Sequence, residues 1–332
     1  MQNVINIQVA VRIRDPKTKY QSCIKVLPPL PNRNITSFDL VDPEGKKQAK
    51  SFNFDNVYNT SCDQLLLYQT CVQPLIEKSL NGFNCSIFCY GQTASGKTYT
   101  MQGLPNNYDG ILFKTFNQIS NYKKNCKNIH FIIKLSYMEI YQETLIDLLV
   151  EKSEINSELK IRTDPESLSG KDLFVQGLTE KCIASEEEFK KLLIFGGKRR
   201  TVGGTQMNEV SSRSHAILTI IIDQISFGEK EIDINSSFSS LPRKRSKINL
   251  IDLAGRVFLK EIKKNLRILL LGSERSDSTG ATGQRMKEGC AINQSLSCLG
   301  NVINALTTKQ QGTKHVPFRD SKLTYLLRYA QH

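Results

Sequence analysis

Alternating and continuous apolar stretches along the chain predict a series of short β-strands. Residues 5–14 alternate apolar and polar side chains, which is typical of a strand with one exposed face. Short apolar runs predict further strands. These runs cover residues 86–90, 132–141, 174–178, 216–222 and 248–252. Residues 17–60 are turn-rich and irregular, so no regular element is predicted there.

Besides a short helix that begins near residue 97 and is stopped by Gly103 and Pro105, three segments are predicted to be helices. The first covers residues 65–80, and the second covers residues 185–195, where Ser185 is expected to be the N-cap. The third, residues 288–306, carries apolar residues at alternating steps of four and three, the spacing of one face of an amphipathic helix. Those residues are Ile292, Leu296, Leu299, Ile303 and Leu306. This face is expected to pack in the core, which leaves the polar face available to a partner.

Length and composition predict a globular protein. The chain has 332 residues, 39% of them hydrophobic, enough for one large or two medium domains with a substantial core. It has no apolar run of membrane-spanning length, and its start lacks the layout of a secretory signal, so an intracellular protein is expected. Nine cysteines without a Cys-x-x-Cys pair predict reduced thiols. The four histidines show no metal-ligand spacing with them, so structural zinc is not expected.

The formal net charge of +13 favours an acidic partner, which leaves nucleic acid, an anionic membrane and an acidic protein surface as alternatives. One basic cluster lies at residues 243–247, and residues 309–332 carry five Lys and Arg side chains against one acidic residue. An ordinary solvated face also accounts for either cluster. The charge alone therefore does not identify the partner.

One segment carries a phosphate-binding pattern. Residues 91–98 read Gly91-Gln92-Thr93-Ala94-Ser95-Gly96-Lys97-Thr98, two glycines with four residues between them, followed by Lys-Thr. The segment follows a predicted strand and precedes residues that can open a helix. In this context the glycines let backbone N–H groups turn toward phosphate oxygens, while Lys97 reaches the β- and γ-phosphates and the Thr98 hydroxyl can bind Mg²⁺. A glycine-rich turn without function is the ordinary alternative.

Two further segments fit a nucleotide site. Residues 208–215, which read Asn-Glu-Val-Ser-Ser-Arg-Ser-His, form a polar, hydroxyl-rich stretch directly before a predicted strand. The strand at 248–252 ends in Asp252, and Leu-Ala-Gly follows. In phosphate-loop enzymes a second strand ends in an aspartate that holds Mg²⁺ directly or through water. The phosphate loop and Asp252 therefore support each other.

The order of these motifs resembles the kinesin motor domain. Further matches are Leu-Ser-Tyr-Met-Glu-Ile-Tyr at 135–141, Thr-Gly-Ala-Thr-Gly at 279–283, Lys-Glu-Gly-Cys-Ala-Ile-Asn-Gln-Ser-Leu at 287–296 and His-Val-Pro-Phe-Arg-Asp-Ser-Lys-Leu-Thr at 315–324. The resemblance runs from about residue 5 to residue 327, and the loop with its continuation Tyr-Thr-Met looks most like the centromere-associated kinesins. It implies an α/β phosphate-loop NTPase fold, with a mixed central sheet flanked by helices on both faces. It also implies a cytoplasmic ATPase that binds ATP and Mg²⁺ and moves along microtubules.

The resemblance implies a role for individual residues around the nucleotide. Arg12 and Arg14 match the family's adenine-side motif, although Asp15 stands where a proline is usual, and Tyr99 is placed to stack on the base. Thr98 and Ser212 would bind Mg²⁺, and Asp252 would reach it through water. Ser211 and Ser212 would form the first switch and close over the γ-phosphate. Arg213 would pair with Glu274 of the second switch, which positions the attacking water.

The implied partner is the microtubule, whose acidic surface would meet the helix at 288–306 and the basic stretch at 309–328. Lys314, Arg319 and Lys322 are the microtubule-binding candidates of this stretch. Tyr325 sits where a basic residue is common in the family, so weaker contact is expected there. Binding of nucleic acid is disfavoured because the basic clusters lack interleaved aromatic residues. A GTP switch protein is disfavoured because the chain has no Asn-Lys-x-Asp motif.

An insertion splits the second switch. The family reads Asp-Leu-Ala-Gly-Ser-Glu without interruption, whereas residues 256–272 here separate Gly255 from Ser273 and Glu274. Positioning contributes roughly 7–11 kcal/mol at the extreme, so a displaced Glu274 could abolish hydrolysis. One hypothesis is a retained intron or gene-model error, because glycines flank the insertion; the other is a genuine surface loop. The alternative function is a kinesin-like protein that binds microtubules without ATP turnover.

The end of the chain also departs from the family, which continues into another central strand, a last helix and a neck. The expected domain therefore covers residues 5–332 and is incomplete at its C-terminus, and the chain contains no heptad stalk for oligomerisation.

Overall fold

The structure is a computed structural model that describes eleven stretches of the chain. They are residues 7–14, 23–27, 36–42, 48–104, 107–151, 158–164, 173–202, 213–226, 242–255, 284–307 and 315–328. The chain divides into two compact units, Met1–Pro74 and Leu75–His332.

The first unit contains two small sheets. Strand β1 (Ala10–Arg12) pairs in parallel with β5 (Asn56–Tyr58). Strands β2 (Ile24–Val26), β3 (Thr36–Leu40) and β4 (Lys50–Phe54) form an antiparallel sheet in that order. The strand predicted over residues 5–14 is thus confirmed over Ala10–Arg12.

The prediction that residues 17–60 are irregular is wrong. The Phe38 ring on β3 lies 5.6 Å from Phe52 and 5.5 Å from Phe54 on β4, measured between centroids. Cross-strand aromatic pairs of this kind stabilise antiparallel strands too short to show a clear period in sequence. The available signal was the alternation of Phe52 and Phe54 with polar neighbours.

The predicted helix over residues 65–80 is confirmed. It consists of α1 (Gln64–Leu67), a π-helical turn (Tyr68–Val72) and α2 (Gln73–Leu80) in direct succession. Asp63 caps its start, because the carboxylate accepts a hydrogen bond from the Leu66 N–H at 2.7 Å.

The second unit is built on a mixed six-stranded sheet. Its strands are β6 (Cys85–Cys89), β7 (Ile129–Tyr141), β8 (Thr144–Asp147), β11 (Lys181–Cys182), β12 (His215–Ser226) and β13 (Arg243–Asp252). They follow the order β11-β7-β12-β13-β6, and β8 pairs with β7. All pairs are antiparallel except β13 with β6. A separate hairpin joins β9 (Lys160–Thr163) and β10 (Leu173–Gln176). The strands predicted from apolar runs in this unit are confirmed, with shifted ends.

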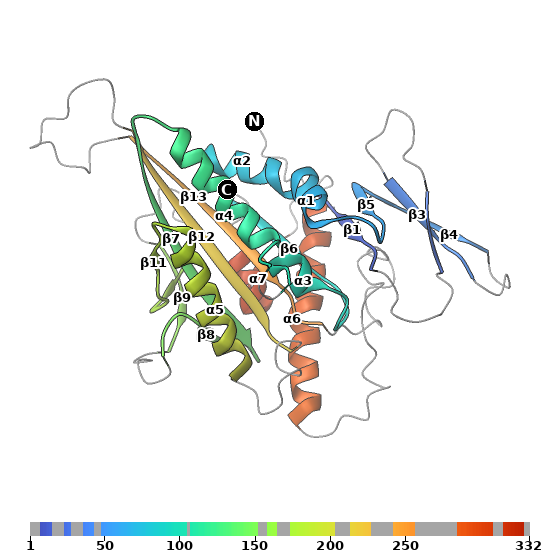
Figure 1. Ribbon diagram of the computed structural model, residues 1–332. Coiled ribbons are helices and arrows are strands. Elements are labelled where there is room, and N and C mark those ends of the chain that lie inside the picture. Colours follow the sequence, from blue (N-terminus) through green and yellow to red (C-terminus); the bar gives the residue numbers. More distant parts are fainter. Residues whose placement is uncertain are drawn as a thin grey trace, which may run out of the picture. The chain divides into compact units, whose positions relative to one another are not determined.

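Helices cover both faces of this sheet (Figure 1). On one face α4 (Ile111–Asn125) packs on α5 (Glu186–Val202), where the Phe116 and Phe189 rings stack at 4.4 Å. On the other face α6 (Gln284–Thr307) and α7 (Lys322–Leu327) enclose a core with Met138 of β7. The predicted fold class and the helix at 288–306 are therefore confirmed. None of the helices in the described stretches is long and apolar enough to cross a membrane.

Helix α4 was not predicted from the sequence. Its buried Ile111, Leu112, Phe116 and Ile119 recur at helical spacing, which was the available signal. Helix α5 approaches the sheet closely at Gly196, where a Cβ atom would lie 2.4 Å from the Tyr137 ring. Only glycine leaves room for that ring.

The capping role predicted for Ser185 at the start of α5 can be tested by substitution. The Ser185 Oγ accepts a hydrogen bond from the Glu188 N–H at 3.2 Å, and the Glu188 carboxylate accepts one from the Ala184 N–H at 2.7 Å. We expect Ser185→Ala to lower the free energy of unfolding by about 1 kcal/mol, measured by urea denaturation. Ser185→Asp keeps a cap acceptor and should retain the stability. An equal loss in both variants would contradict the capping role.

Candidate nucleotide site

The phosphate loop joins the end of β6 to the start of α3 (Lys97–Gln102). Gly96 has a φ of 106°, a conformation that favours glycine. The Lys97 ammonium donates hydrogen bonds to the carbonyl oxygens of Gly91 and Gln92, both at 2.9 Å. The loop therefore wraps around the ammonium group that was predicted to contact phosphates, in the strand–loop–helix setting that the motif requires.

Asp252 lies next to this loop because of the sheet register. Strands β6 and β13 run parallel, and Asp252 is the register partner of Cys89, so the carboxyl ends of both strands meet. The Thr98 hydroxyl donates a hydrogen bond to Asp252 Oδ2 at 2.8 Å. Beyond Asp252, a Cβ atom on Gly255 would lie 2.5 Å from Thr93 Oγ1, so the chain touches the loop there. The structure thus brings together two of the three residues predicted for Mg²⁺.

The oxygen atoms at this point fit a magnesium ion. A threonine hydroxyl and a carboxylate are hard oxygen donors, which Mg²⁺ prefers, and Mg²⁺ usually keeps several bound waters. Asp252 Oδ1 is buried and has no hydrogen-bond partner within the described part of the chain. An unpaired acceptor of this kind suits a metal-bound water that donates a hydrogen bond.

His215, the first residue of β12, connects three segments. Its Nδ1 accepts a hydrogen bond from the Ala254 N–H at 3.1 Å, and its Nε2 lies 2.8 Å from the Ser295 hydroxyl on α6. Burial, together with the positive charges of Arg200 and Lys97, lowers the pKa of His215 to about 3, so the ring is neutral near pH 7. Since Nδ1 accepts, Nε2 carries the proton and donates it to Ser295. One imidazole therefore connects the start of β12 to the segment after β13 and to α6.

Beside His215, the Ser214 hydroxyl donates a short hydrogen bond to Glu139 on β7. Arg213 is buried as well. The remaining predicted residues of both switches, Ser211, Ser212 and Glu274, lie outside the described residues, as does the insertion at 256–272. The pairing of Arg213 with Glu274 stays a prediction.

The three residues predicted on the adenine side differ in their contacts and exposure. Within the first unit, the Arg12 guanidinium donates hydrogen bonds to Gln64 Oε1 at 2.7 Å and to the Cys62 carbonyl at 3.1 Å. Arg14 and Tyr99 of α3 are both exposed. The contact of these three residues with the base stays a prediction.

Of the predicted microtubule-binding residues, Arg319 lies in a 3₁₀ turn (Phe318–Asp320) and Lys322 is the first residue of α7. The exposed Arg319 places its guanidinium carbon 5.8 Å from the centroid of the Tyr325 ring. The backbone N–H of Lys322 donates a hydrogen bond to the Glu143 carboxylate at 2.7 Å, in the β7–β8 turn. Lys314 lies outside the described residues. Tyr325, which replaces a commonly basic residue, is therefore a neighbour of Arg319.

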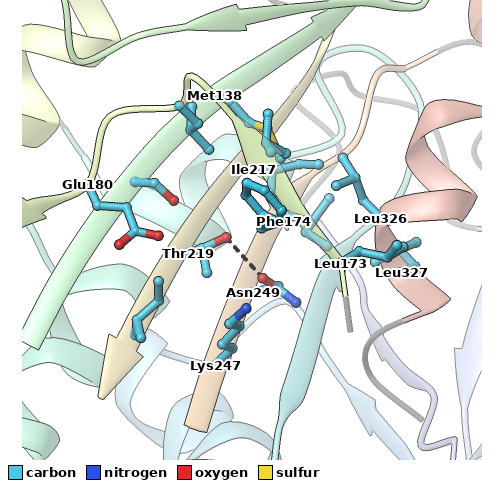
Figure 2. Close-up of a pocket in the computed structure, with 15 residues that line it drawn as sticks. Met138, Leu173, Phe174, Glu180, Ile217, Thr219, Lys247, Asn249, Leu326 and Leu327 are labelled. Atoms are coloured by element: carbon cyan, nitrogen blue, oxygen red, sulfur yellow. Dashed lines mark hydrogen bonds between the residues drawn. The ribbon is translucent and has the colours of Figure 1, made fainter. Parts of the chain in front are cut away.

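A pocket of about 90 Å³ lies elsewhere, on the sheet face beside α7 (Figure 2). Its floor comes from β7, β12 and β13, where Thr219 donates a hydrogen bond to Asn249 at 2.9 Å. Leu173 and Phe174 of β10 and Leu326 and Leu327 close its sides. None of the predicted nucleotide or microtubule residues lines this pocket.

A strand, a phosphate loop and a helix, with a second strand ending in an aspartate beside them, define a phosphate-loop nucleotide-binding protein. Residues 11–330 match the family described as kinesin motor domain. The chain belongs to the kinesin motor domain family, which confirms the resemblance read from the motifs.

Two curated relatives illustrate the similarity. The chain is 39% identical over 325 residues to the kinesin-like protein Klp68D of Drosophila melanogaster, covering 97% of this chain and 36% of that protein. It is 40% identical over 284 residues to the chromosome-associated kinesin KIF4 of Gallus gallus, covering 84% and 21%. The chain thus spans about a third or less of the length of these relatives.

Solved structures agree with this assignment. A structure of residues 391–755 of KIF14 with ADP, in complex with a microtubule, matches with a TM-score of 0.74 and 32% identity. The match covers 97% of this chain and 85% of that one.

Proposed function

We propose that the chain is the motor domain of an ATP-driven microtubule motor, extending over residues 5–332 with 256–272 as an insertion. The observation that carries the proposal is the 2.8 Å hydrogen bond between Thr98 and Asp252, beside the loop that surrounds Lys97. It supports a site at this strand-to-helix junction in which the Lys97 ammonium would bind phosphate and the two oxygens would bind the metal. The membership in the kinesin family supports ATP, with Mg²⁺, as the nucleotide.

The residues of the chain act mainly by positioning. Backbone N–H groups of residues 91–96 bind phosphate oxygens, and Lys97 exchanges two loop carbonyls for the β- and γ-phosphates. Thr98 and Ser212 would hold Mg²⁺, and Asp252 would reach it through water. Mg²⁺, when bound, neutralises the charge of the transferred phosphoryl group. Ser211 would close over the γ-phosphate, and Arg213 with Glu274 would orient the attacking water, a role of Glu274 that the insertion at 256–272 impairs.

Turnover is coupled to the microtubule through α6. His215 hydrogen-bonds both the second switch at Ala254 and α6 at Ser295, so release of the switches after hydrolysis also releases a contact to that helix. The polar face of α6, together with the nearby sequence positions Lys314, Arg319 and Lys322, then binds the acidic filament with a different affinity. A related kinesin bound to a microtubule supports this partner. We accordingly place the protein on cytoplasmic microtubules.

Steady-state ATPase assays with and without microtubules test the proposal, together with co-sedimentation in different nucleotides. We expect microtubules to stimulate ATP turnover and filament affinity to depend on the nucleotide. Co-sedimentation without turnover would favour the alternative, a kinesin-like protein that binds microtubules only. The proposal would be overturned if the protein neither bound nor hydrolysed Mg·ATP and its affinity for microtubules were the same with every nucleotide.

A further inference from the structure

Arg200, near the C-terminal end of α5, is a buried cation that the sequence motifs did not single out. Only 4% of its surface is exposed. Its Nη1 donates a hydrogen bond to Asp252 Oδ2 at 3.1 Å, and its Nη2 donates one to the Ser214 carbonyl at 3.1 Å. Its Nε lies 3.7 Å from Glu139 Oε1. One side chain thus contacts the end of β13, the segment before β12 and strand β7.

The two carboxylates around it are buried as well, with Asp252 3% and Glu139 4% exposed. A buried carboxylate needs a partner of opposite charge, and a guanidinium holds several acceptors at fixed angles through its planar fork. Two donors, Thr98 Oγ1 and Arg200 Nη1, share Asp252 Oδ2. Together they define the orientation of the carboxylate and leave Oδ1 without a partner in the described residues.

We propose that Arg200 is a positioning residue that fixes Asp252 for the Mg²⁺-bound water and links its position to the backbone of Ser214, next to Arg213. This inference rests on the proposed nucleotide site. The Arg200 guanidinium contacts both switch segments, because Asp252 precedes the second switch and Ser214 lies at the end of the first switch. A shift of either segment changes the geometry at the other through two hydrogen bonds on one rigid group.

The purely structural alternative is that Arg200 only balances buried negative charge. Arg200→Lys separates the two roles, because lysine keeps the charge but lacks the fork. In the full-length protein we would measure ADP affinity with excess Mg²⁺ and with EDTA, and the midpoint of thermal unfolding. Because contacts to metal-binding groups typically change metal affinity by 10–100-fold, we expect Arg200→Lys to reduce the gain in ADP affinity from Mg²⁺ by about tenfold or more. Its affinity in EDTA and its unfolding midpoint should stay unchanged.

The neighbouring Arg199 provides a matched control. It lies 3.7 Å from Glu151 and contacts neither switch in the described residues, so Arg199→Lys should leave all three quantities unchanged. An unchanged effect of Mg²⁺ in Arg200→Lys, or an equal loss of affinity with and without Mg²⁺, would overturn the proposal.

A balanced double variant covers the case in which Arg200→Lys unfolds. Arg200→Met with Glu139→Gln removes one buried positive and one buried negative charge together. This protein should fold and still lose most of the effect of Mg²⁺ on ADP affinity; full retention would refute the role of Arg200. Failure of the unaltered protein to bind ADP would instead refute the nucleotide site itself.

Discussion

Deleting residues 256–272 is expected to raise microtubule-stimulated ATP turnover by about 100-fold or more, because misplacing a reacting group by 1 Å can cost that much. Gly255 touches the phosphate loop at Thr93. In the deleted protein Glu274 follows two residues after Gly255, so it lies within about 7 Å of it along the chain. In the present sequence eighteen residues, 256–273, lie between the two positions. The deletion therefore confines Glu274 to the neighbourhood of Gly255 and the phosphate loop, where it is predicted to pair with Arg213.

Glu274→Ala, made with and without the insertion, is the matched control. If the gain comes from repositioning this carboxylate, the substitution should abolish the gain in the shortened protein and change little in the long one. Equal turnover of the long and shortened proteins would contradict the prediction, and would show that the insertion is a surface loop that preserves the switch. Transcript sequencing that consistently contains these codons would reject the intron hypothesis independently.

The parts of the site that depend on local spacing were predictable from sequence. Two glycines and a Lys-Thr pair predicted the loop around Lys97, and an apolar strand ending in aspartate predicted Asp252. Their hydrogen-bonded contact depends on the parallel pairing of β6 and β13, which only the fold provides. The long strands and α6 were predictable for the same reason, since each carries a sustained apolar pattern.

Features that depend on contacts distant in sequence were missed. Arg200 lies near the basic C-terminal end of α5, a sequence pattern typical of a solvent-exposed surface. Its partners, however, are Glu139, Ser214 and Asp252, which are distant in sequence. No periodicity marks such a residue. Likewise, β3 and β4 are only five residues each, and the Phe38 contacts that stabilise them form only after the strands pair. Short strands and buried charges are thus decided by tertiary structure.

Lys97→Ala is expected to lower ATP turnover at least about 100-fold, since charge-stabilising groups in such sites contribute that much. The Lys97 ammonium donates hydrogen bonds to two loop carbonyl oxygens at 2.9 Å, so its position in the loop is already fixed. Its loss removes a positive charge from the β- and γ-phosphates, where negative charge is greatest during transfer. Single-turnover ATPase measurements and ATP-binding titrations would measure the loss.

Lys78→Ala is the control, because Lys78 is an exposed lysine near the end of α2. It should leave turnover and ATP affinity unchanged, which separates the position of the charge from the net charge of the protein. The unfolding midpoint of Lys97→Ala should also match the unaltered protein, since the substitution leaves the apolar core intact. Turnover reduced less than tenfold in a folded Lys97→Ala protein would mean that phosphate binding occurs without this residue, and the site would have to be assigned elsewhere.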